Sequence, residues 1–327
     1  MKNYRTWISP GDFADLRYKI QEKGFSVVLS LLRLSGRKRT VNKWDQVTPG
    51  SDFWIIPSVR KRWNQKCTGD AETEYEDYVY EKYLKDIKDI RMLSVGCGTG
   101  ARERKFGRYK NFQKIEGIDI APSKIEEAIS TARNDGLENI VYQTGDFRSF
   151  IPEPGSYDVI LFNSSLHHFS RIESLISNNV VPLLKSNGIL VIFEYVGPKR
   201  LQWTNEQLDR VNALLNEMPE HFRRMPGGIE IKKRVYRPGL LRMMLVDPSE
   251  AAESDQIMPV VHRHFITVEE KKVGWELLQP LLKGISHNFL SDNEETGELI
   301  SYLFSEEDKY MEETGRSDAV FGIYKVK

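Results

Sequence analysis

The sequence predicts an α/β fold in which helices cover both faces of a mixed, seven-stranded sheet. Between residues 90 and about 196, short β-type runs alternate with helical stretches. Such alternation is typical of βαβ units, which form a parallel sheet with helices on both sides. Two later apolar runs, Phe265–Val273 and Ala319–Val326, can pair antiparallel at one edge and complete the sheet.

Each expected element of the parallel part has a local signal. The expected strands are short runs rich in aliphatic side chains, namely Arg91–Val95, Lys114–Ile118, Ile140–Gln143, Tyr157–Phe162 and Gly188–Phe193. The expected helices that connect them are Ala101–Tyr109, Pro122–Asn134 and Arg171–Leu184. Proline suits the first turn of a helix because its missing N–H is not needed there, so the second helix is expected to begin at Pro122.

The chain is expected to divide into an N-terminal helical cap at residues 1–88 and a main domain at residues 89–327. Apolar side chains form a stripe from Leu16 to Leu34, and aromatic side chains recur at helical spacing between Tyr75 and Tyr83. Both patterns are typical of helices that pack one face against a larger body.

An insertion is expected at about residues 197–250, where the alternation of strands and helices breaks down. Pro248 is expected to begin the helix that follows, which leaves the insertion on the substrate side of the sheet. Basic side chains gather in it, namely Arg223, Arg224, Lys232, Lys233, Arg234 and Arg237. They could grip an anionic acceptor such as a sugar phosphate, or form a solvated face.

Composition excludes several classes of protein. Lys plus Arg and Asp plus Glu each number 47, and this net charge of zero argues against general binding of nucleic acid. The two cysteines, Cys67 and Cys97, cannot form a disulfide framework, so a reducing cytoplasm is the expected location. The longest apolar stretch, Phe25–Leu34, is too short for a transmembrane segment.

A glycine-rich loop follows the first expected strand. Gly96, Gly98 and Gly100 alternate with Cys97 and Thr99 before a helix begins. Glycine is needed where a ligand lies against the backbone, although a structural turn would use it too. The G-x-G-x-G spacing differs from the G-x-G-x-x-G of dinucleotide binders, which place a pyrophosphate at the helix N-terminus. The loop therefore indicates a nucleoside ligand without a pyrophosphate.

Polar residues follow the next strands as well. Asp119, followed by Ile120, ends the second strand, where a carboxylate can accept hydrogen bonds from vicinal ribose hydroxyls or cap the next helix. After the third strand, Asp146 can accept a hydrogen bond from an adenine amino group, and Phe147 can pack against the adenine ring. Because ligands of open α/β folds bind at the carboxyl ends of the strands, Asn163 after the fourth strand is expected to join this site.

The order of these motifs resembles that of the class I S-adenosylmethionine-dependent methyltransferases, whose fold is Rossmann-like. The resemblance is strong over residues 90 to 196. The turn Leu166–His168 resembles the corresponding turn in a bacterial subgroup of this family that is associated with small-molecule and glycan pathways. The resemblance implies S-adenosylmethionine as cofactor and S-adenosylhomocysteine as product. By residue, it implies that the cofactor is held by Gly96, Cys97, Gly98, Gly100, Asp119, Ile120, Asp146, Phe147 and Asn163. The Asn/Asp-Pro-Pro-aromatic turn that methylases of nucleobase amines carry after the fourth strand is absent, which argues against a nucleobase amine as acceptor.

The chemistry expected of such a protein is an in-line methyl transfer, in which the protein aligns the acceptor and removes its proton. A hydroxyl of a small molecule or glycan needs a base of near-neutral pKa, and imidazole is the natural one. His167 and His168 follow the fourth strand, and either could be that base. Glu194, at the end of the fifth strand, could orient the imidazole and stabilise its cation.

Other functions stay open at this stage. A nicotinamide-dependent oxidoreductase is disfavoured by the glycine spacing, and a non-catalytic regulatory or scaffold protein would also retain the fold. His262 and His264, two apart on an expected strand, could share a metal ion, but no third ligand is evident, so no metal is expected. Self-association into a homo-oligomer is compatible with the sequence.

Overall fold

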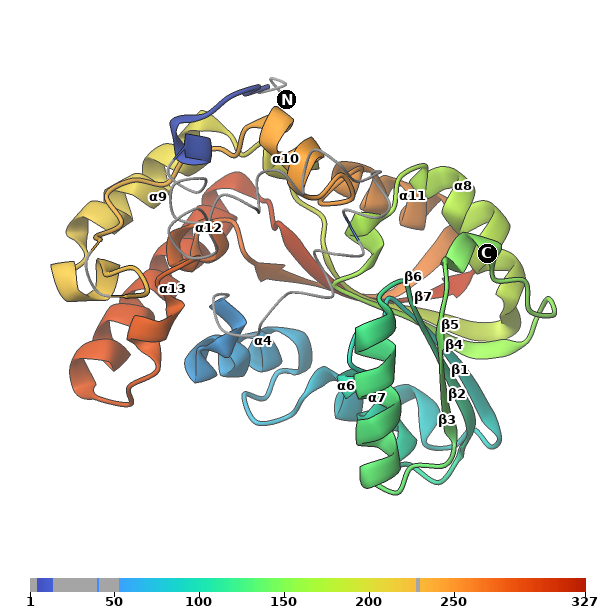
Figure 1. Ribbon diagram of the computed structural model, residues 1–327. Helices are drawn as coiled ribbons and strands as arrows, with labels where there is room; N and C mark the ends of the chain where they lie inside the picture. Colours follow the sequence, from blue (N-terminus) through green and yellow to red (C-terminus); the bar gives the residue numbers. More distant parts are fainter. Residues whose placement is uncertain (1–4, 14–39, 41–52, 228–229) are drawn as a thin grey trace.

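The computed structural model describes residues 5–13, 40, 53–227 and 230–327, and their centre is one sheet (Figure 1). The strand order is β3-β2-β1-β4-β5-β7-β6, and the seven strands are β1 (Ile90–Val95), β2 (Phe112–Asp119), β3 (Ile140–Thr144), β4 (Tyr157–Asn163), β5 (Leu184–Tyr195), β6 (Phe265–Gly274) and β7 (Ala319–Val326). The first five pair in parallel, and β7 runs antiparallel to β5 and β6. The predicted mixed seven-stranded sheet is confirmed.

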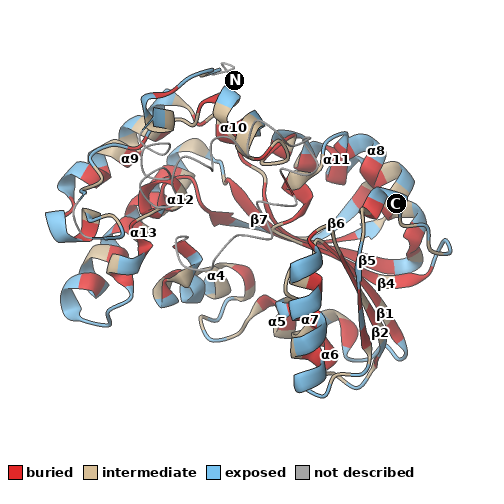
Figure 2. Cartoon of the chain, in the orientation of Figure 1, coloured by how far each residue is buried: buried red, intermediate tan, exposed pale blue. Residues whose placement is uncertain are grey.

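Helices lie on both faces, as predicted. The α-helices are α4 (Pro57–Thr68), α5 (Tyr75–Val79), α6 (Ala101–Gly107), α7 (Pro122–Asn134), α8 (Ile172–Leu175), α9 (Asn205–Glu217), α10 (Leu240–Val246), α11 (Ile257–His264), α12 (Leu278–Leu282) and α13 (Glu294–Thr314). One hydrophobic cluster lies between one face of the sheet and helices α4, α5, α6 and α7. Another lies between the opposite face and helices α8 and α11. Figure 2 shows the central strands buried and the outer faces of the helices exposed, whereas the edge strands β3 and β6 are largely exposed.

Local patterns explain how these layers form. In β4, Val159 and Leu161 belong to one cluster and Ile160 and Phe162 to the other, because successive side chains of a strand point to opposite faces. The segment expected as one helix at 171–184 is instead divided into α8, a π-helical turn and a 3-10 turn. The reason is Pro182, which has no N–H to continue α-helical hydrogen bonding.

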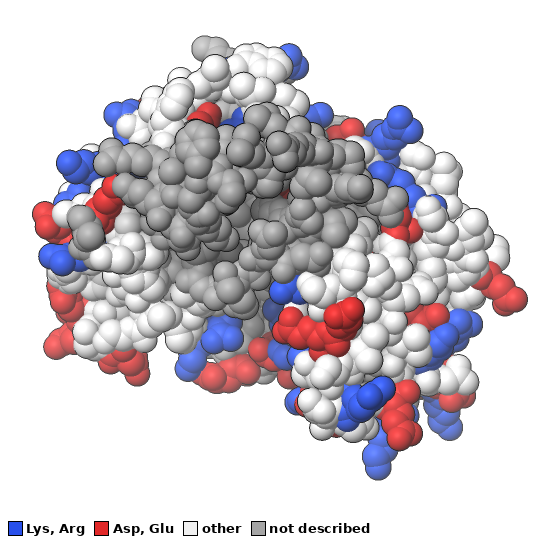
Figure 3. Space-filling view, in the orientation of Figure 1, with Lys and Arg blue, Asp and Glu red and all other residues white. Residues whose placement is uncertain are grey.

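The helical segments after β5 and β6 come together beside the sheet. The insertion expected at 197–250 contains α9 and α10, whereas the connection between β6 and β7 contains α12 and α13. Helix α12 contacts both α9 and α13, so the two segments build one helical lobe (Figure 1). On the face seen in Figure 3, acidic and basic side chains are interspersed, in keeping with the neutral net charge.

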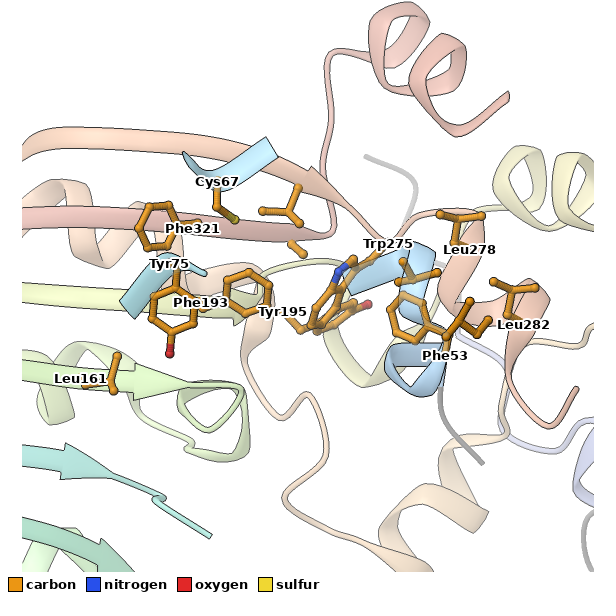
Figure 4. Close-up of a cluster of buried hydrophobic side chains, with 14 of the residues drawn as sticks. Phe53, Cys67, Tyr75, Leu161, Phe193, Tyr195, Trp275, Leu278, Leu282 and Phe321 are labelled. Atoms are coloured by element: carbon orange, nitrogen blue, oxygen red, sulfur yellow. The ribbon is translucent and has the colours of Figure 1, made fainter. Parts of the chain in front are cut away.

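An aromatic cluster fixes the N-terminal helices against the end of β5. Figure 4 shows Trp275 between Phe193 of β5 and Phe53, and the ring centroids lie 5.7 and 5.5 Å from that of Trp275. Tyr75 of α5 stacks on Phe193 at 5.6 Å. The expected stripe from Leu16 to Leu34 lies outside the described residues.

Within the described residues of the structure, no helix combines the length and the apolar character that crossing a membrane requires.

Candidate active site

The glycine loop leaves β1 at the carboxyl edge of the sheet. Gly96, Gly98 and Gly100 all have positive φ angles, of 72°, 54° and 74°, which glycine adopts without strain. A Cβ on Gly96 would lie 2.5 Å from the Cβ of Ser165, and one on Gly100 would lie 2.3 Å from the hydroxyl of Tyr142. At Gly98, no described atom lies within 4 Å of the same position. The protein itself therefore needs Gly96 and Gly100, while Gly98 leaves room for a ligand.

The side chain of Cys97 turns away from this room. A Cβ on Gly117 would lie 3.0 Å from the Cys97 sulfur, so the thiol packs against the neighbouring strand. Burial raises the pKa of Cys97 well above its usual value, and the thiol stays neutral. The sulfur also lies 3.9 Å from the carbonyl oxygen of Gly98.

Asp119 ties the end of β2 to the glycine loop. Its carboxylate accepts the N–H of Gly98 at 2.9 Å and the N–H of Ala121 at 2.9 Å. The second bond lies just before α7, whose N-cap residue is Ala121, so Asp119 is not the helix cap considered from the sequence. Ile120, the next residue, is half-buried at the same edge. The predicted ribose contact would add to the structural role of Asp119.

Phe147 lies elsewhere than expected. Only 3% of its surface is exposed, and its ring centroid lies 6.1 Å from Phe162 and 6.3 Å from Phe169 in edge-on contacts. The ring is therefore part of the core rather than an exposed wall for adenine. Asp146, half-buried, accepts the N–H of Arg148 at 3.0 Å. An aromatic residue after a strand gives the same sequence signal in either position.

The end of β4 contacts a residue that the sequence did not assign to the site. The hydroxyl of Tyr75, in α5, donates to Oδ1 of Asn163 at 2.8 Å. Next to Asn163, Ser164 adopts a left-handed φ of 51°, and Ser165 donates from its hydroxyl to the carbonyl of Val95 at 2.6 Å. Helical spacing marked Tyr75 as a packing residue and carried no sign of this contact.

His167 and Glu194 meet, as expected for orientation of the imidazole. Nδ1 of His167 lies 2.7 Å from Oε2 of Glu194, which is fully buried. The other carboxylate oxygen accepts the N–H groups of Ser165 at 2.5 Å and Leu166 at 2.6 Å. In the tautomer in which Nδ1 donates its hydrogen to Oε2, Nε2 bears the lone pair. This arrangement suits Nε2 to receive a proton.

A turn, rather than the helix expected at Pro248, closes over the two histidines. Asp247 accepts the N–H and the hydroxyl of Ser249 at 3.0 and 2.5 Å, and such side-chain bonds to nearby backbone favour turns over helix. The Ser249 hydroxyl lies 3.2 Å from Nδ1 of His168. Glu250, which sequence reasoning missed, places Oε1 4.0 Å from Nε2 of His167.

Potential metal ligands are distributed differently from the alternative weighed from the sequence. His262 and His264 lie in helix α11 instead of a strand, and each pairs with a different glutamate at 2.6 Å, so a shared ion there is wrong. Among the described residues, one set of possible ligand atoms gathers within 4.8 Å, on His168, Asp247 and Glu250. The turn after Asp247 creates this set, and nothing in the local sequence pattern marked it.

Two basic residues of the insertion hold the lobe together. Lys232 donates to three carbonyl oxygens at and just after the end of α12, at 2.7 to 3.0 Å. Arg237 donates to the carbonyl of Trp203 at 2.7 Å and the hydroxyl of Thr6 at 3.0 Å. For these two residues, the expected grip on an anionic acceptor gives way to a structural role.

A family model described as a methyltransferase domain matches residues 86–261, more than half of the chain. The chain belongs to this methyltransferase family. The matched region runs from just before β1 into α11 and includes the glycine loop, His167 and Glu194. The resemblance to class I S-adenosylmethionine-dependent methyltransferases is therefore confirmed, and the room beside Gly98 fits a cofactor at the loop.

Individual relatives are distant. The chain is 29% identical over 133 residues to an uncharacterized methyltransferase, YcgJ, of Bacillus subtilis, with 41% of this chain and 50% of that protein covered. It is 26% identical over 188 residues to malonyl-[acyl-carrier protein] O-methyltransferase 1 of Ilyobacter polytropus, and the match covers 54% of this chain and 68% of that protein. The crystal structure of YcgJ aligns with a TM-score of 0.38 and 17% identity, over 74% of this chain and 91% of that one. The chain thus spans half the length of the first of these relatives.

Proposed function

We propose that this methyltransferase transfers a methyl group from S-adenosylmethionine to a hydroxyl of a small molecule or glycan, with His167 as general base. The observation that carries the proposal is the pairing of His167 with the buried Glu194, at 2.7 Å. That pairing leaves the basic nitrogen of the imidazole on the side away from Glu194.

The register of the sheet supports the placement of the cofactor. Val95 of β1 pairs with Ile118 of β2 on one side and with Phe162 of β4 on the other. The residues that follow, Gly96, Asp119 and Asn163, therefore line one edge. When bound, S-adenosylmethionine supplies a methyl group on a positively charged sulfur, from which it passes to the acceptor oxygen as the carbon–sulfur bond breaks.

The protein's own part is to hold the acceptor and accept its proton. Nε2 of His167 takes the hydroxyl proton as the new oxygen–carbon bond forms, and Glu194 stabilises the imidazolium that results. The choice of His167 over His168 rests on the partner of Nδ1, which is a buried carboxylate for His167 and a serine hydroxyl for His168. The name of the Ilyobacter relative supports an oxygen acceptor.

The test is methyl transfer itself. Purified protein is incubated with methyl-labelled S-adenosylmethionine and fractionated small-molecule and glycan extracts, and products are identified by mass spectrometry. Labelled methyl ethers that require His167 would support the proposal, whereas methyl esters would point to a carboxylate acceptor and contradict it. Methylated amines would contradict the hydroxyl acceptor. No product despite cofactor binding would favour the regulatory or scaffold alternative, whereas the family match leaves no support for a nicotinamide enzyme.

Three wider expectations are also proposals. Residues 1–88 would act as a cap at the cofactor site, and the contact of Tyr75 with Asn163 supports this. The chain would work in a reducing cytoplasm, which its two free cysteines support. Size measurement in solution would test self-association into a homo-oligomer.

A further inference from the structure

Helix α5 is held in register against α6, the helix into which the glycine loop leads. The carboxylate of Glu76, fully buried, accepts from Arg102 at 2.7 Å, and Asp77 accepts from the hydroxyl of Tyr109 at 2.7 Å. Lys105 pairs with Glu74 at the start of α5. These contacts hold α5 beside α6 (Figure 2).

Tyr75 stands at the centre of this contact. Its ring stacks on Phe193 with an interplanar angle of 9°, and the guanidinium of Arg102 lies 5.6 Å from its centroid. In Figure 4 its hydroxyl points out of the aromatic cluster, toward the strand that carries Leu161. There it meets Oδ1 of Asn163 at 2.8 Å. Burial raises the pKa of Tyr75 well above its usual value, so the hydroxyl keeps its hydrogen and donates it.

This donation fixes the amide of Asn163. With Oδ1 directed at Tyr75, the two N–H groups of the amide point the other way. Asn163 is the last residue of β4, next to the end of β1 and one strand further from Asp119 than Gly96 is. With the ribose at Asp119, an amino-acid half that follows the glycine loop would lie over β1 and β4.

We propose that Tyr75 is a positioning residue of the cofactor site, which orients the Asn163 amide to donate to the methionine half of S-adenosylmethionine. The inference rests on the proposed placement of the cofactor and not on the identity of the acceptor. It makes one residue of the N-terminal region part of the methyl-donor site. The nucleoside half, over β2 and β3, does not depend on Tyr75.

The chain offers a matched control on the same helix. The hydroxyl of Tyr78 donates to Glu269 of β6 at 2.8 Å, on the side away from the glycine loop. Tyr75→Phe and Tyr78→Phe each remove a tyrosine hydroxyl of α5. The Tyr78 hydroxyl also accepts from Lys82 at 2.6 Å, so the control variant loses at least as many contacts. Only Tyr75→Phe disturbs Asn163.

The experiment measures binding of S-adenosylhomocysteine and of adenosine, which lacks the amino-acid half, by calorimetry. Tyr75→Phe is expected to weaken the binding of S-adenosylhomocysteine about three- to tenfold, the effect of losing one neutral hydrogen bond, and to leave the binding of adenosine unchanged. Asn163→Ala should lose at least as much, and the double variant should lose no more than Asn163→Ala alone. Tyr78→Phe should bind both probes as the parent protein does.

Several results would overturn the inference. If Tyr75→Phe loses as much affinity for adenosine as for S-adenosylhomocysteine, Tyr75 supports the whole site. If the loss in the double variant equals the sum of the two single losses, Tyr75 does not act through Asn163. Unchanged affinity of Tyr75→Phe would remove its role altogether. Failure of the parent protein to bind S-adenosylhomocysteine would overturn the cofactor placement itself, which is distinguishable because no acceptor takes part in the measurement.

Discussion

Glu194 binds the side chain of His167 and the backbone before it with the same carboxylate. One oxygen accepts Nδ1–H of His167 at 2.7 Å, and the other accepts the N–H groups of Ser165 and Leu166 at 2.5 and 2.6 Å. The end of β5 thereby fixes both the turn after β4 and the direction of the imidazole. Removing this carboxylate would leave buried donors without partners, which is costly.

The two histidines are expected to differ in their effect on turnover. His167→Asn should lower kcat about 10²–10⁴-fold with cofactor affinity retained, because a general base contributes that much. His168→Asn, whose ring contacts Ser249, should lower kcat far less. Methyl transfer and S-adenosylhomocysteine binding are measured side by side. Near-normal turnover by the double variant would rule out base catalysis by this pair.

The pH profile should depend on Glu194. Activity is expected to rise with pH as the imidazole loses its proton, since the neutral form is the base. A carboxylate at Nδ1 favours the cation, so Glu194→Gln should move the profile to lower pH and slow the reaction. Initial rates between pH 5.5 and 9 check both effects. A slower enzyme with an unmoved profile would indicate a structural role for Glu194 alone.

Gly98 allows a direct test of the cofactor loop. Gly98→Ala places a methyl group where no described atom lies within 4 Å, and Gly136→Ala does the same at a φ of 70° remote from the loop. Both changes should cost about 1 kcal/mol in stability, because alanine is strained at positive φ. Only Gly98→Ala should weaken the binding of S-adenosylhomocysteine, by at least about tenfold. Equal binding by the two variants would remove Gly98 from the site.

A buried acid should make stability fall at alkaline pH. Glu276 is 2% exposed, and neither carboxylate oxygen has a hydrogen-bond partner among the described residues. Burial, with the charges of Asp318 and Glu307, raises its pKa to about 9 from 4.5. The folded protein thus holds a proton that the unfolded chain releases, and the free energy of unfolding declines as pH rises between those values.

Glu276→Gln should remove most of that decline. The variant is expected to exceed the parent protein in stability by more than about 1 kcal/mol at pH 9, measured by denaturant unfolding from pH 5 to 9. Glu298→Gln, at an exposed position of α13, serves as the control and should leave the slope unchanged. A Glu276→Gln slope equal to that of the parent would show that this carboxyl is already ionised when folded.

The elements predicted well are those with a local cause. Pro122 starts α7, and Ile125, Ala128 and Ala132 recur on one face, so the start of the helix and its buried face follow from its own residues. The glycine loop was likewise readable, because its three glycines follow a buried strand. The parallel direction of β1 to β5 followed from the alternation of strands and helices.

The rest of the site depends on residues far apart in the chain. Tyr75 reaches Asn163 across 88 positions, and Glu250 reaches His167 only because Asp247 binds Ser249 and turns the chain. The sequence by itself determined the sheet, the glycine loop and the presence of polar groups at the strand ends. Tertiary structure alone decided which of those groups meet and that Phe147 is buried, because such contacts depend on how distant segments pack and not on the spacing of neighbouring residues.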